Sequence, residues 1–213
     1  YPPREMDLGD IRRVSEKFRE AARRSMDAGY QICEVHGAHG YLLHSFLSPV
    51  SNHRQDAYGG DREGRMRFPL EVAEVVRDVW PDDLPVFYRI SCVDGEGGAW
   101  DLDDSVALAK ALKDRDIDLI DCSSGGIKGD SKMPMVPRVP GFQVAFSDRV
   151  RRDAGLPTIA VGLIIEPRQA EDILQTGKAD MVALARELLW HADWPAHAAV
   201  ELGGADAYDI MPE

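Results

Sequence analysis

The sequence has 213 residues, of which 44% are hydrophobic and 29% are charged, and it carries a formal net charge of -12 at pH 7. This length suits one sizeable domain, and the composition is that of an ordinary globular protein. The negative charge disfavours binding to nucleic acids and to anionic membrane surfaces. No apolar run approaches the ~20 residues that a membrane-spanning helix needs, and no signal-peptide pattern opens the chain.

The three cysteines, Cys33, Cys92 and Cys122, show no C-x-x-C spacing, and each stands in an apolar run typical of a strand. This pattern predicts buried free thiols in a reducing cytosol, and hence a cytoplasmic protein. Because the chain begins at Tyr1 without an initiator methionine and stops after "YDIMPE", we expect it to be a fragment of a longer protein.

Helical and strand patterns alternate along the chain. Apolar residues with helical spacing predict a first helix over residues 10–28, and a β-prone run ending at His36 follows it. The same order then recurs: helix 65–79 precedes strand 85–91, helix 102–116 precedes strand 118–124, helix 147–153 precedes strand 157–162, and helix 167–177 precedes strand 180–186. No tight hairpin separates two strands, so parallel strands are expected.

Strands that alternate with helices form either a doubly wound sheet or a (β/α)8 barrel. Three helix–strand joints resemble one another, which favours repeated βα units: "AGYQICEVHG", "DRDIDLIDCSSG" and "TGKADMVALAR". Barrel enzymes build their sites from several strand ends, whereas doubly wound sheets use one switch point. Candidate functional residues stand at or near five strand ends: His36, Arg89, Ser123, Gly162 and Arg186. We therefore predict one α/β domain over residues 1–213, a partial TIM barrel with about the last five βα units and without its N-terminal strands and C-terminal tail.

His36, His39 and Tyr41 lie within the stretch "HGAHGYLLHSFLSPVSNHR". A metal site needs acidic or thiol ligands as well, and this stretch offers none. The histidines are then either ordinary core or loop residues, or a pair whose N–H groups bind a carbonyl oxygen or the enolate that replaces it. A tyrosine beside them can deliver a proton. The strand-end position of His36 favours the pair, whereas His44 and His53 are interpreted as structural.

Two further places suggest an anionic cofactor. Arg89 stands inside the apolar run "PVFYRIS", where it forms either a structural ion pair or a contact with an electron-accepting ring. Gly162 and Arg186 end the last two strands, where many barrels hold a phosphate on backbone N–H groups and a cation. The "SSGG" loop at 123–126 is either a similar contact or a flexible turn.

From "HGAHGYLLHSFLSPVSNHRQDAYGGDREGRMRF" through "YRIS", "DLIDCSSGG", "AVGLI", "AEDILQTGKADMVALARELL" and "WPAHAA", the sequence resembles the flavin-dependent ene-reductases related to old yellow enzyme. The resemblance covers nearly the whole chain. It implies a (β/α)8 barrel that holds FMN at its C-terminal rim, takes electrons from NADPH or NADH, and reduces the C=C bond of small α,β-unsaturated carbonyl compounds. The C-terminal tail of the bacterial branch can complete a neighbouring subunit's site, which implies a homo-oligomer.

The resemblance also implies roles for individual residues. His36 and His39 would bind the substrate carbonyl, and Tyr41 would protonate the substrate α-carbon. Arg89 would approach the N1/O2 side of the flavin. The FMN phosphate would contact Gly162, Leu163, Ala185 and Arg186, with Arg186 as its main cation.

Other hypotheses stay open. A dienoyl-thioester reductase or an amine dehydrogenase of the same superfamily would usually add an iron–sulfur cluster, whose cysteine-rich segment is not visible. A flavin-free, phosphate-binding barrel isomerase or lyase would need a strand-end lysine or glutamate, and no convincing one is found. Because a partial barrel leaves strand edges unpaired, we expect the isolated chain to bind FMN poorly or to aggregate.

Overall fold

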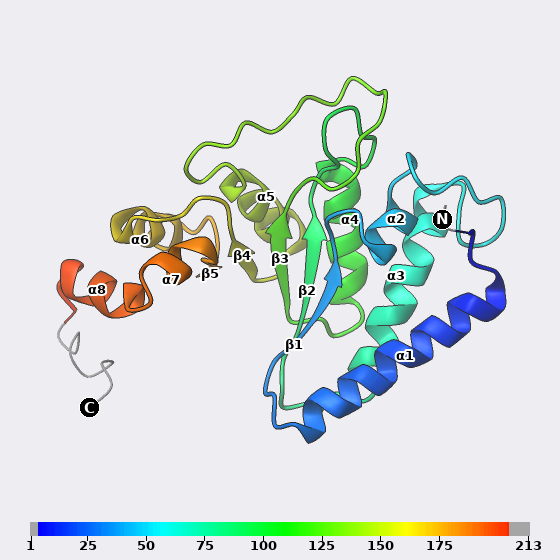
Figure 1. Ribbon diagram of the computed structural model, residues 1–213, viewed down its shortest axis with the longest axis horizontal. Helices are drawn as coiled ribbons and strands as arrows, with labels where there is room; N and C mark the ends of the chain where they lie inside the picture. The colour runs from blue at the N-terminus through cyan, green and yellow to red at the C-terminus, as the bar shows by residue number, and fades with distance from the viewer. Residues whose placement is uncertain (1–3, 205–213) are drawn as a thin grey trace.

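The computed structural model describes residues 4–204, which form a five-stranded parallel sheet flanked by helices (Figure 1). The strands are β1 (Cys33–Gly37), β2 (Val86–Ser91), β3 (Leu119–Ser123), β4 (Thr158–Ala160) and β5 (Met181–Val182). The helices are α1 (Leu8–Asp27), α2 (Leu42–Leu47), α3 (Arg62–Arg77), α4 (Leu102–Lys113), α5 (Val144–Ala154), α6 (Pro167–Gln175), α7 (Arg186–Trp190) and α8 (Trp194–Glu201). Every strand and helix predicted from the sequence is confirmed.

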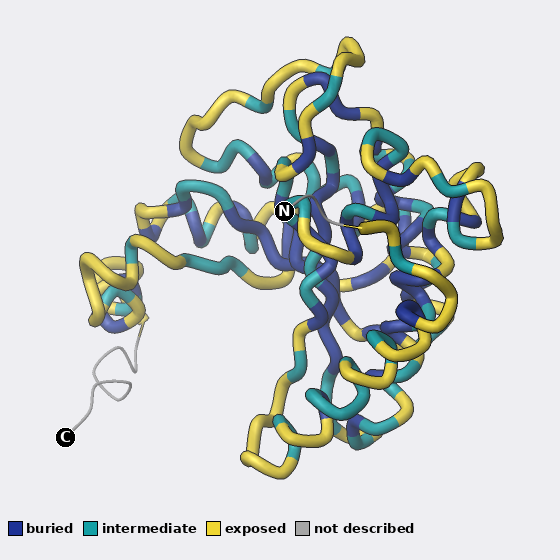
Figure 2. The backbone as a smooth tube through the Cα atoms, turned by 45° about the vertical axis from the view of Figure 1, so that its right-hand side comes forward, coloured by how far each residue is buried: buried dark blue, intermediate teal, exposed yellow. Residues whose placement is uncertain are grey.

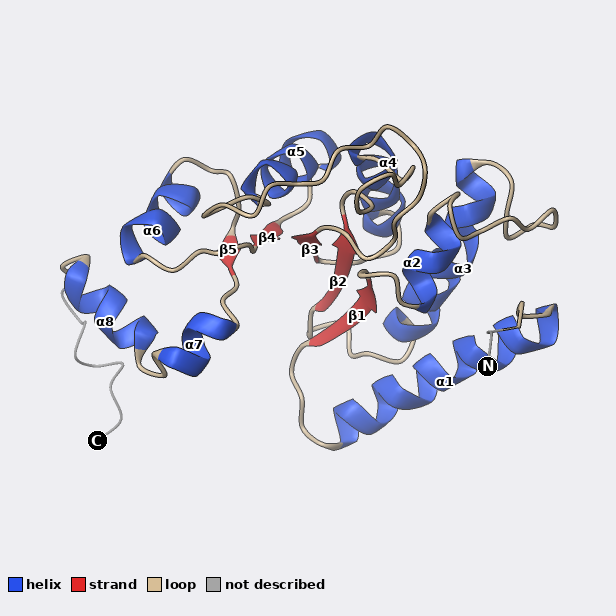
Figure 3. Ribbon diagram, turned by 45° about the horizontal axis from the view of Figure 1, so that its top comes forward, coloured by secondary structure: helices blue, strands red, loops and turns tan. Residues whose placement is uncertain are grey.

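Each strand pairs with the next one along the chain, in the order β1-β2-β3-β4-β5, and every pair is parallel. His36 lies beside Arg89 in the register, and Arg89 lies beside Asp121. In Figure 3 the strands follow an arc, and α3 to α6 lie along its outer side. Because the order of the five described strands never reverses, their sheet has no switch point, and the carboxyl ends of the strands share one curved rim. This is the arrangement of consecutive βα units of a barrel.

The two faces of the sheet have different environments because side chains alternate along a strand. The outer face packs Tyr88 and Ile120 against the helices in the main apolar core. The inner face carries a smaller apolar cluster: Phe87, Leu119, Ile159 and Val161. Two residues further along β2 and β3, the inner face turns polar at Arg89 and Asp121. The strands β2, β3 and β4 are almost entirely buried, whereas β5, α7 and most of α8 are exposed or half-buried, as the colours of Figure 2 show.

Some local features differ from the sequence prediction. The helices α2 and α8 have 6 and 8 residues, too short to show a helical period in the sequence. The prediction of buried cysteines is confirmed for Cys92 and Cys122 but is wrong for Cys33, which is half-buried because β1 has a partner on one side only within the described sheet. None of the described helices combines the length and apolar character that a bilayer crossing requires.

A buried serine fixes the loop that follows β2. The Ser105 hydroxyl, in α4, donates a hydrogen bond to the carbonyl oxygen of Cys92 at 2.8 Å and accepts one from Trp100 Nε1 at 2.8 Å. All three residues are fully buried. The serine therefore pairs two polar groups that water cannot reach, and it holds α4 against the end of β2.

We expect Ser105→Ala to lower the free energy of unfolding by about 1–3 kcal/mol, because Trp100 Nε1 and the Cys92 carbonyl lose their partner in a buried place. Urea denaturation followed by tryptophan fluorescence measures the change. Ser15→Ala serves as the control, since that hydroxyl only bonds the Ile11 carbonyl within α1, and we expect it to stay within about 0.5 kcal/mol. An equally small loss for Ser105→Ala would contradict the buried bridge.

Candidate active site

The turn that follows β1 brings three predicted site residues together. His36 lies in β1, His39 lies in the turn, and Tyr41 is the N-cap of α2. The His36 ring centroid is 5.2 Å from that of His39 and 5.5 Å from that of Tyr41. Tyr41 is 66% exposed, so its ring is accessible from outside. The three rings form one cluster at the carboxyl rim of the sheet.

His39 is held by the two neighbouring strands. Its backbone is left-handed, with φ of 61°, a conformation that residues other than glycine rarely adopt. The His39 N–H donates to Ser91 Oγ at 2.9 Å, and the Ser91 hydroxyl donates in turn to the Gly125 carbonyl at 2.7 Å. His39 Nε2 lies 2.7 Å from Ser123 Oγ. The ends of β1, β2 and β3 are thereby joined through this one histidine.

Gly126 allows the loop after β3 to pass directly against this turn. Its φ is 110°, and a Cβ atom there would lie 2.1 Å from the His39 carbonyl carbon and 2.3 Å from the Gly40 nitrogen. No side chain fits in that space. Of the two interpretations of the "SSGG" segment, a flexible turn does not apply, because the segment packs tightly against the histidine cluster.

Both histidines of the cluster are neutral at pH 7. Burial lowers the pKa of His39 to about 4, and repulsion from Arg89, His36 and His44 adds to the shift. Burial also lowers the pKa of His36, with a further contribution from Arg89. A neutral imidazole carries one N–H donor and one acceptor nitrogen, so the position of the proton matters.

The Ser123 hydroxyl is the ring partner of His39. It lies 2.7 Å from His39 Nε2 and 3.4 Å from Gln143 Oε1, and it can donate its proton to only one of them at a time. When Ser123 donates to Nε2, the His39 proton lies on Nδ1, and the ring keeps an N–H donor that Ser123 does not use. When Ser123 donates to Gln143, it accepts from the His39 Nε2–H instead.

Arg89 and Asp121 face each other on the inner face of the sheet. Arg89 Nε lies 3.2 Å from Asp121 Oδ2, within ion-pair distance but without the alignment of a hydrogen bond. Burial raises the pKa of Asp121 to about 7 despite the attraction of Arg89, and Glu34 raises it further. The ion-pair interpretation of Arg89 therefore applies. The guanidinium group also lines a cavity, where it can meet a further acceptor.

An open cavity of about 840 Å³ runs along the rim from the end of β2 to the start of α7. Its volume lies within the roughly 300–1,000 Å³ that is usual for cofactor sites. The structure brings His39 and all five residues predicted to hold the cofactor to this cavity: Arg89, Gly162, Leu163, Ala185 and Arg186. His36 and Tyr41 lie beside the cavity and not among the residues that line it.

The shape and charge of this cavity fit FMN. Gly162 and Leu163 have φ of 118° and 53°, and a Cβ at Gly162 would lie 3.1 Å from the Phe142 ring, so the backbone there forms a close cradle. Arg186 is exposed and forms no ion pair within residues 4–204, which leaves its charge available for a phosphate. At the other end, the buried Arg89 Nε lacks a hydrogen-bond acceptor among the described residues.

Two residues of this site, Gln143 and Ser91, were not predicted from the sequence. Gln143 is 4% exposed, lines the cavity and accepts a hydrogen bond from Ser124 Oγ at 2.6 Å. It follows an irregular segment without any period, so no sequence signal could have found it. Ser91 is the last residue of a strand, and that position at the rim was a usable signal.

The low pKa of His39 predicts a loss of stability in acid. The folded pKa of about 4 lies below the ordinary value of 6.5, so the unfolded chain binds the proton first as the pH falls through this window. Wild type should therefore lose free energy of unfolding when the pH falls from about 7.5 to about 4.5. We expect this loss to be about 1 kcal/mol smaller in His39→Asn, a value reduced for the partial exposure of the ring. Denaturant titrations at both pH values measure it.

The matched control for this prediction is His53→Asn, because His53 is an exposed histidine outside the cluster. Its acid sensitivity should equal that of wild type. If His39→Asn also equals wild type, His39 titrates at an ordinary pKa, and its inferred neutrality at pH 5 to 7 is wrong.

Comparison with known proteins places this site in a family. The sequence profile of the NADH:flavin oxidoreductase / NADH oxidase family matches residues 1–203. An NADPH dehydrogenase of Geobacillus sp. (strain WCH70) is 49% identical over 212 residues, which make up 99% of this chain and 60% of that relative. The chain therefore spans about 60% of the length of this curated relative.

Two solved structures share the fold. A complex of 2-naphthoyl-CoA reductase with 2-naphthoyl-CoA has a TM-score of 0.82 at 27% identity, covering 95% of this chain and 31% of that one. Morphinone reductase has a TM-score of 0.70 at 26% identity, covering 89% of this chain and 49% of that one. These findings confirm the partial barrel, and they agree with the expectation of an oxidoreductase that uses FMN and NAD(P)H. The chain belongs to the NADH:flavin oxidoreductase / NADH oxidase family, the family of old yellow enzyme.

Proposed function

We propose that the protein is an FMN-dependent NAD(P)H oxidoreductase that reduces the C=C bond of small α,β-unsaturated carbonyl compounds. The observation that carries this proposal is the convergence of two neutral imidazoles and an exposed phenol beside the cofactor cavity. The ring centroids of His39 and Tyr41 lie 5.2 Å and 5.5 Å from that of His36, and His39 itself lines the cavity.

In this proposal, His36 and His39 bind the substrate carbonyl and Tyr41 supplies a proton. When bound, FMN supplies the redox chemistry, taking a hydride from NAD(P)H and passing it to the substrate β-carbon. His36 and His39 donate N–H groups to the carbonyl oxygen, and they stabilise the negative charge that develops there. Tyr41 donates its phenolic proton to the α-carbon, and its exposed ring regains a proton from water.

The remaining cavity residues hold the cofactor in this proposal. Arg89 would face the flavin ring, where a cation stabilises added negative charge. The residues that would hold the phosphate line the other end of the cavity, at the ends of the last two strands: Gly162, Leu163, Ala185 and Arg186.

A thioester of an α,β-unsaturated acid is the second candidate substrate. The similarity to a reductase solved with 2-naphthoyl-CoA favours it, and the same histidine pair can bind a thioester carbonyl. An amine substrate offers no carbonyl to this pair, and the family match disfavours a flavin-free isomerase or lyase. The homo-oligomeric state and the cytoplasmic location stay predictions.

We expect the purified protein, at its natural length, to show a flavin absorbance band that NADPH bleaches under anaerobic conditions. Addition of 2-cyclohexenone should restore the band, and a CoA thioester added in its place tests the second candidate. A colourless protein, or a bleached flavin that neither compound re-oxidises, would contradict the proposed function.

We expect Tyr41→Phe to slow re-oxidation by the enone by about 10²-fold, because the phenol is the proton donor, and to leave reduction by NADPH nearly unchanged. Stopped-flow absorbance measures the two half-reactions separately. Tyr30→Phe is the matched control, because Tyr30 is 65% exposed but precedes β1 at the opposite end of the strand. Equal slowing of both half-reactions would refute the proton-donor role of Tyr41.

A further inference from the structure

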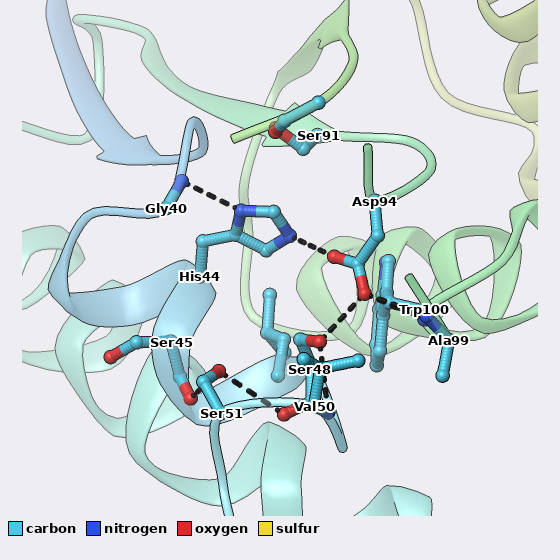
Figure 4. A network of polar contacts seen from close by, with 12 residues as sticks. Gly40, His44, Ser45, Ser48, Val50, Ser51, Ser91, Asp94, Ala99 and Trp100 are labelled. Atoms are coloured by element: carbon cyan, nitrogen blue, oxygen red, sulfur yellow. Dashed lines mark hydrogen bonds and ion pairs between the residues drawn. The ribbon is translucent and has the colours of Figure 1, made fainter. Parts of the chain in front are cut away.

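A buried His–Asp pair lies directly beneath the turn that carries His39 and Tyr41 (Figure 4). The His44 and Asp94 side chains are both 0% exposed, and His44 Nε2 lies 2.8 Å from Asp94 Oδ1. The angle departs from that of an ideal hydrogen bond, but neither atom has another partner within residues 4–204. Asp94 also lines the cofactor cavity, whereas His44 does not, and the proposed chemistry uses neither side chain.

Asp94 is well satisfied as a carboxylate. Its Oδ2 accepts hydrogen bonds from Ser48 Oγ at 2.6 Å and from the backbone N–H groups of Ala99 and Trp100, each at 2.9 Å. Burial by itself would raise the pKa of Asp94, but the hydrogen bonds from His44, Ser48 and the backbone outweigh it and hold the pKa below its ordinary value. Oδ1 is therefore a charged acceptor that faces the His44 ring.

The other ring nitrogen of His44 has a defined partner as well. The Gly40 N–H donates to His44 Nδ1 at 2.9 Å. An N–H donor requires a lone pair on Nδ1, so the single proton of the neutral ring must lie on Nε2. That is the nitrogen that faces Asp94. The two contacts agree on one tautomer, and in Figure 4 the ring lies between Gly40 and Asp94 with a contact to each.

The Gly40 N–H connects the His44–Asp94 pair to the turn that carries His39 and Tyr41. His39 and Gly40 are both left-handed, with φ of 61° and 77°, and such a conformation is unfavourable for a histidine. The Gly40 N–H has no backbone acceptor among the described residues, so His44 Nδ1 is its partner. This hydrogen bond fixes the peptide plane between His39 and Gly40, and Tyr41 follows at once.

We propose that His44 is a positioning residue: Asp94 keeps its proton on Nε2, and the free Nδ1 holds the Gly40 N–H so that His39 and Tyr41 face the substrate together. This assigns to His44 a role beyond the structural one that the sequence suggested. The catalytic consequence rests on the proposed function, whereas the tautomer and the hydrogen bond do not.

Two substitutions separate positioning from general packing. His44→Asn places an amide oxygen close to the position of Nδ1, so it can still accept from Gly40, but it no longer reaches Asp94. His44→Gln reaches toward Asp94 with an amide N–H but offers no acceptor at the Nδ1 position. Each variant leaves one former partner of His44 unpaired, and His44→Asn should lose more thermal stability, because its orphaned partner is the charged Asp94 Oδ1 and not a neutral N–H. Only His44→Gln releases the turn.

The test uses the protein at its natural length with three readouts. In wild type, ¹⁵N chemical shifts should show His44 as the neutral Nε2–H tautomer at pH 7. Hydrogen exchange at the Gly40 amide should be about tenfold or more faster in His44→Gln than in His44→Asn. Re-oxidation of the reduced flavin at saturating enone should be about tenfold or more slower in His44→Gln than in His44→Asn, with flavin reduction by NADPH nearly equal.

Several outcomes overturn the proposal. A His44 ring protonated on Nδ1, or on both nitrogens, contradicts it in wild type alone, even if neither variant folds. Equal Gly40 exchange and equal re-oxidation in two folded variants would reduce His44 to a packing role. If wild type does not react with any enone, the proposed function fails by itself, and the tautomer and the exchange contrast still decide whether His44 holds the turn.

Discussion

The hydrogen bond from the His39 backbone to Ser91 Oγ is the contact on which the candidate site depends. It works only because parallel strands in register end at the same rim, so that Ser91, Ser123 and the turn after β1 meet. The chain of donors then continues from Ser91 to the Gly125 carbonyl. A shift of β2 by one residue would turn Ser91 to the outer face, since side chains alternate, and would leave the turn without its anchor.

Burial at this rim acts in opposite directions on acids and bases, and it thereby sets the charge of the site. The same loss of water that lowers the pKa of His39 to about 4 raises the pKa of Asp121 to about 7. Near neutral pH the imidazoles are uncharged and Asp121 is only partly ionised, whereas the arginines keep their charge. The cavity lining carries four basic side chains, Arg89, Lys128, Arg138 and Arg186, against three acidic ones, Asp94, Glu96 and Glu187, although the whole chain carries a net charge of -12. The local placement of charge, and not the overall composition, decides what this rim can bind.

The sequence predicted the order of strands and helices because long amphipathic helices and apolar strands leave a clear period, as in α1 and α4. It also predicted the strand ends that the structure brings to one cavity, such as Arg89 and Arg186. The close packing of Gly126 on His39 has no such signal, because it joins residues far apart in the chain. The same holds for Asp94 and His44, whose pairing depends on how the loop after β2 folds back on α2.

The contrast between His39 and His44 explains why an acid belongs beneath the turn and not within it. A carboxylate next to His39 would favour its imidazolium form, which could no longer serve as a neutral donor of low basicity. The ring partner of His39 is instead the Ser123 hydroxyl, which carries no charge. Asp94 is placed one layer deeper, where it orients His44 and influences the turn only through the Gly40 N–H. Charge is therefore used for orientation behind the site, and neutral donors remain where the proposed enolate would form.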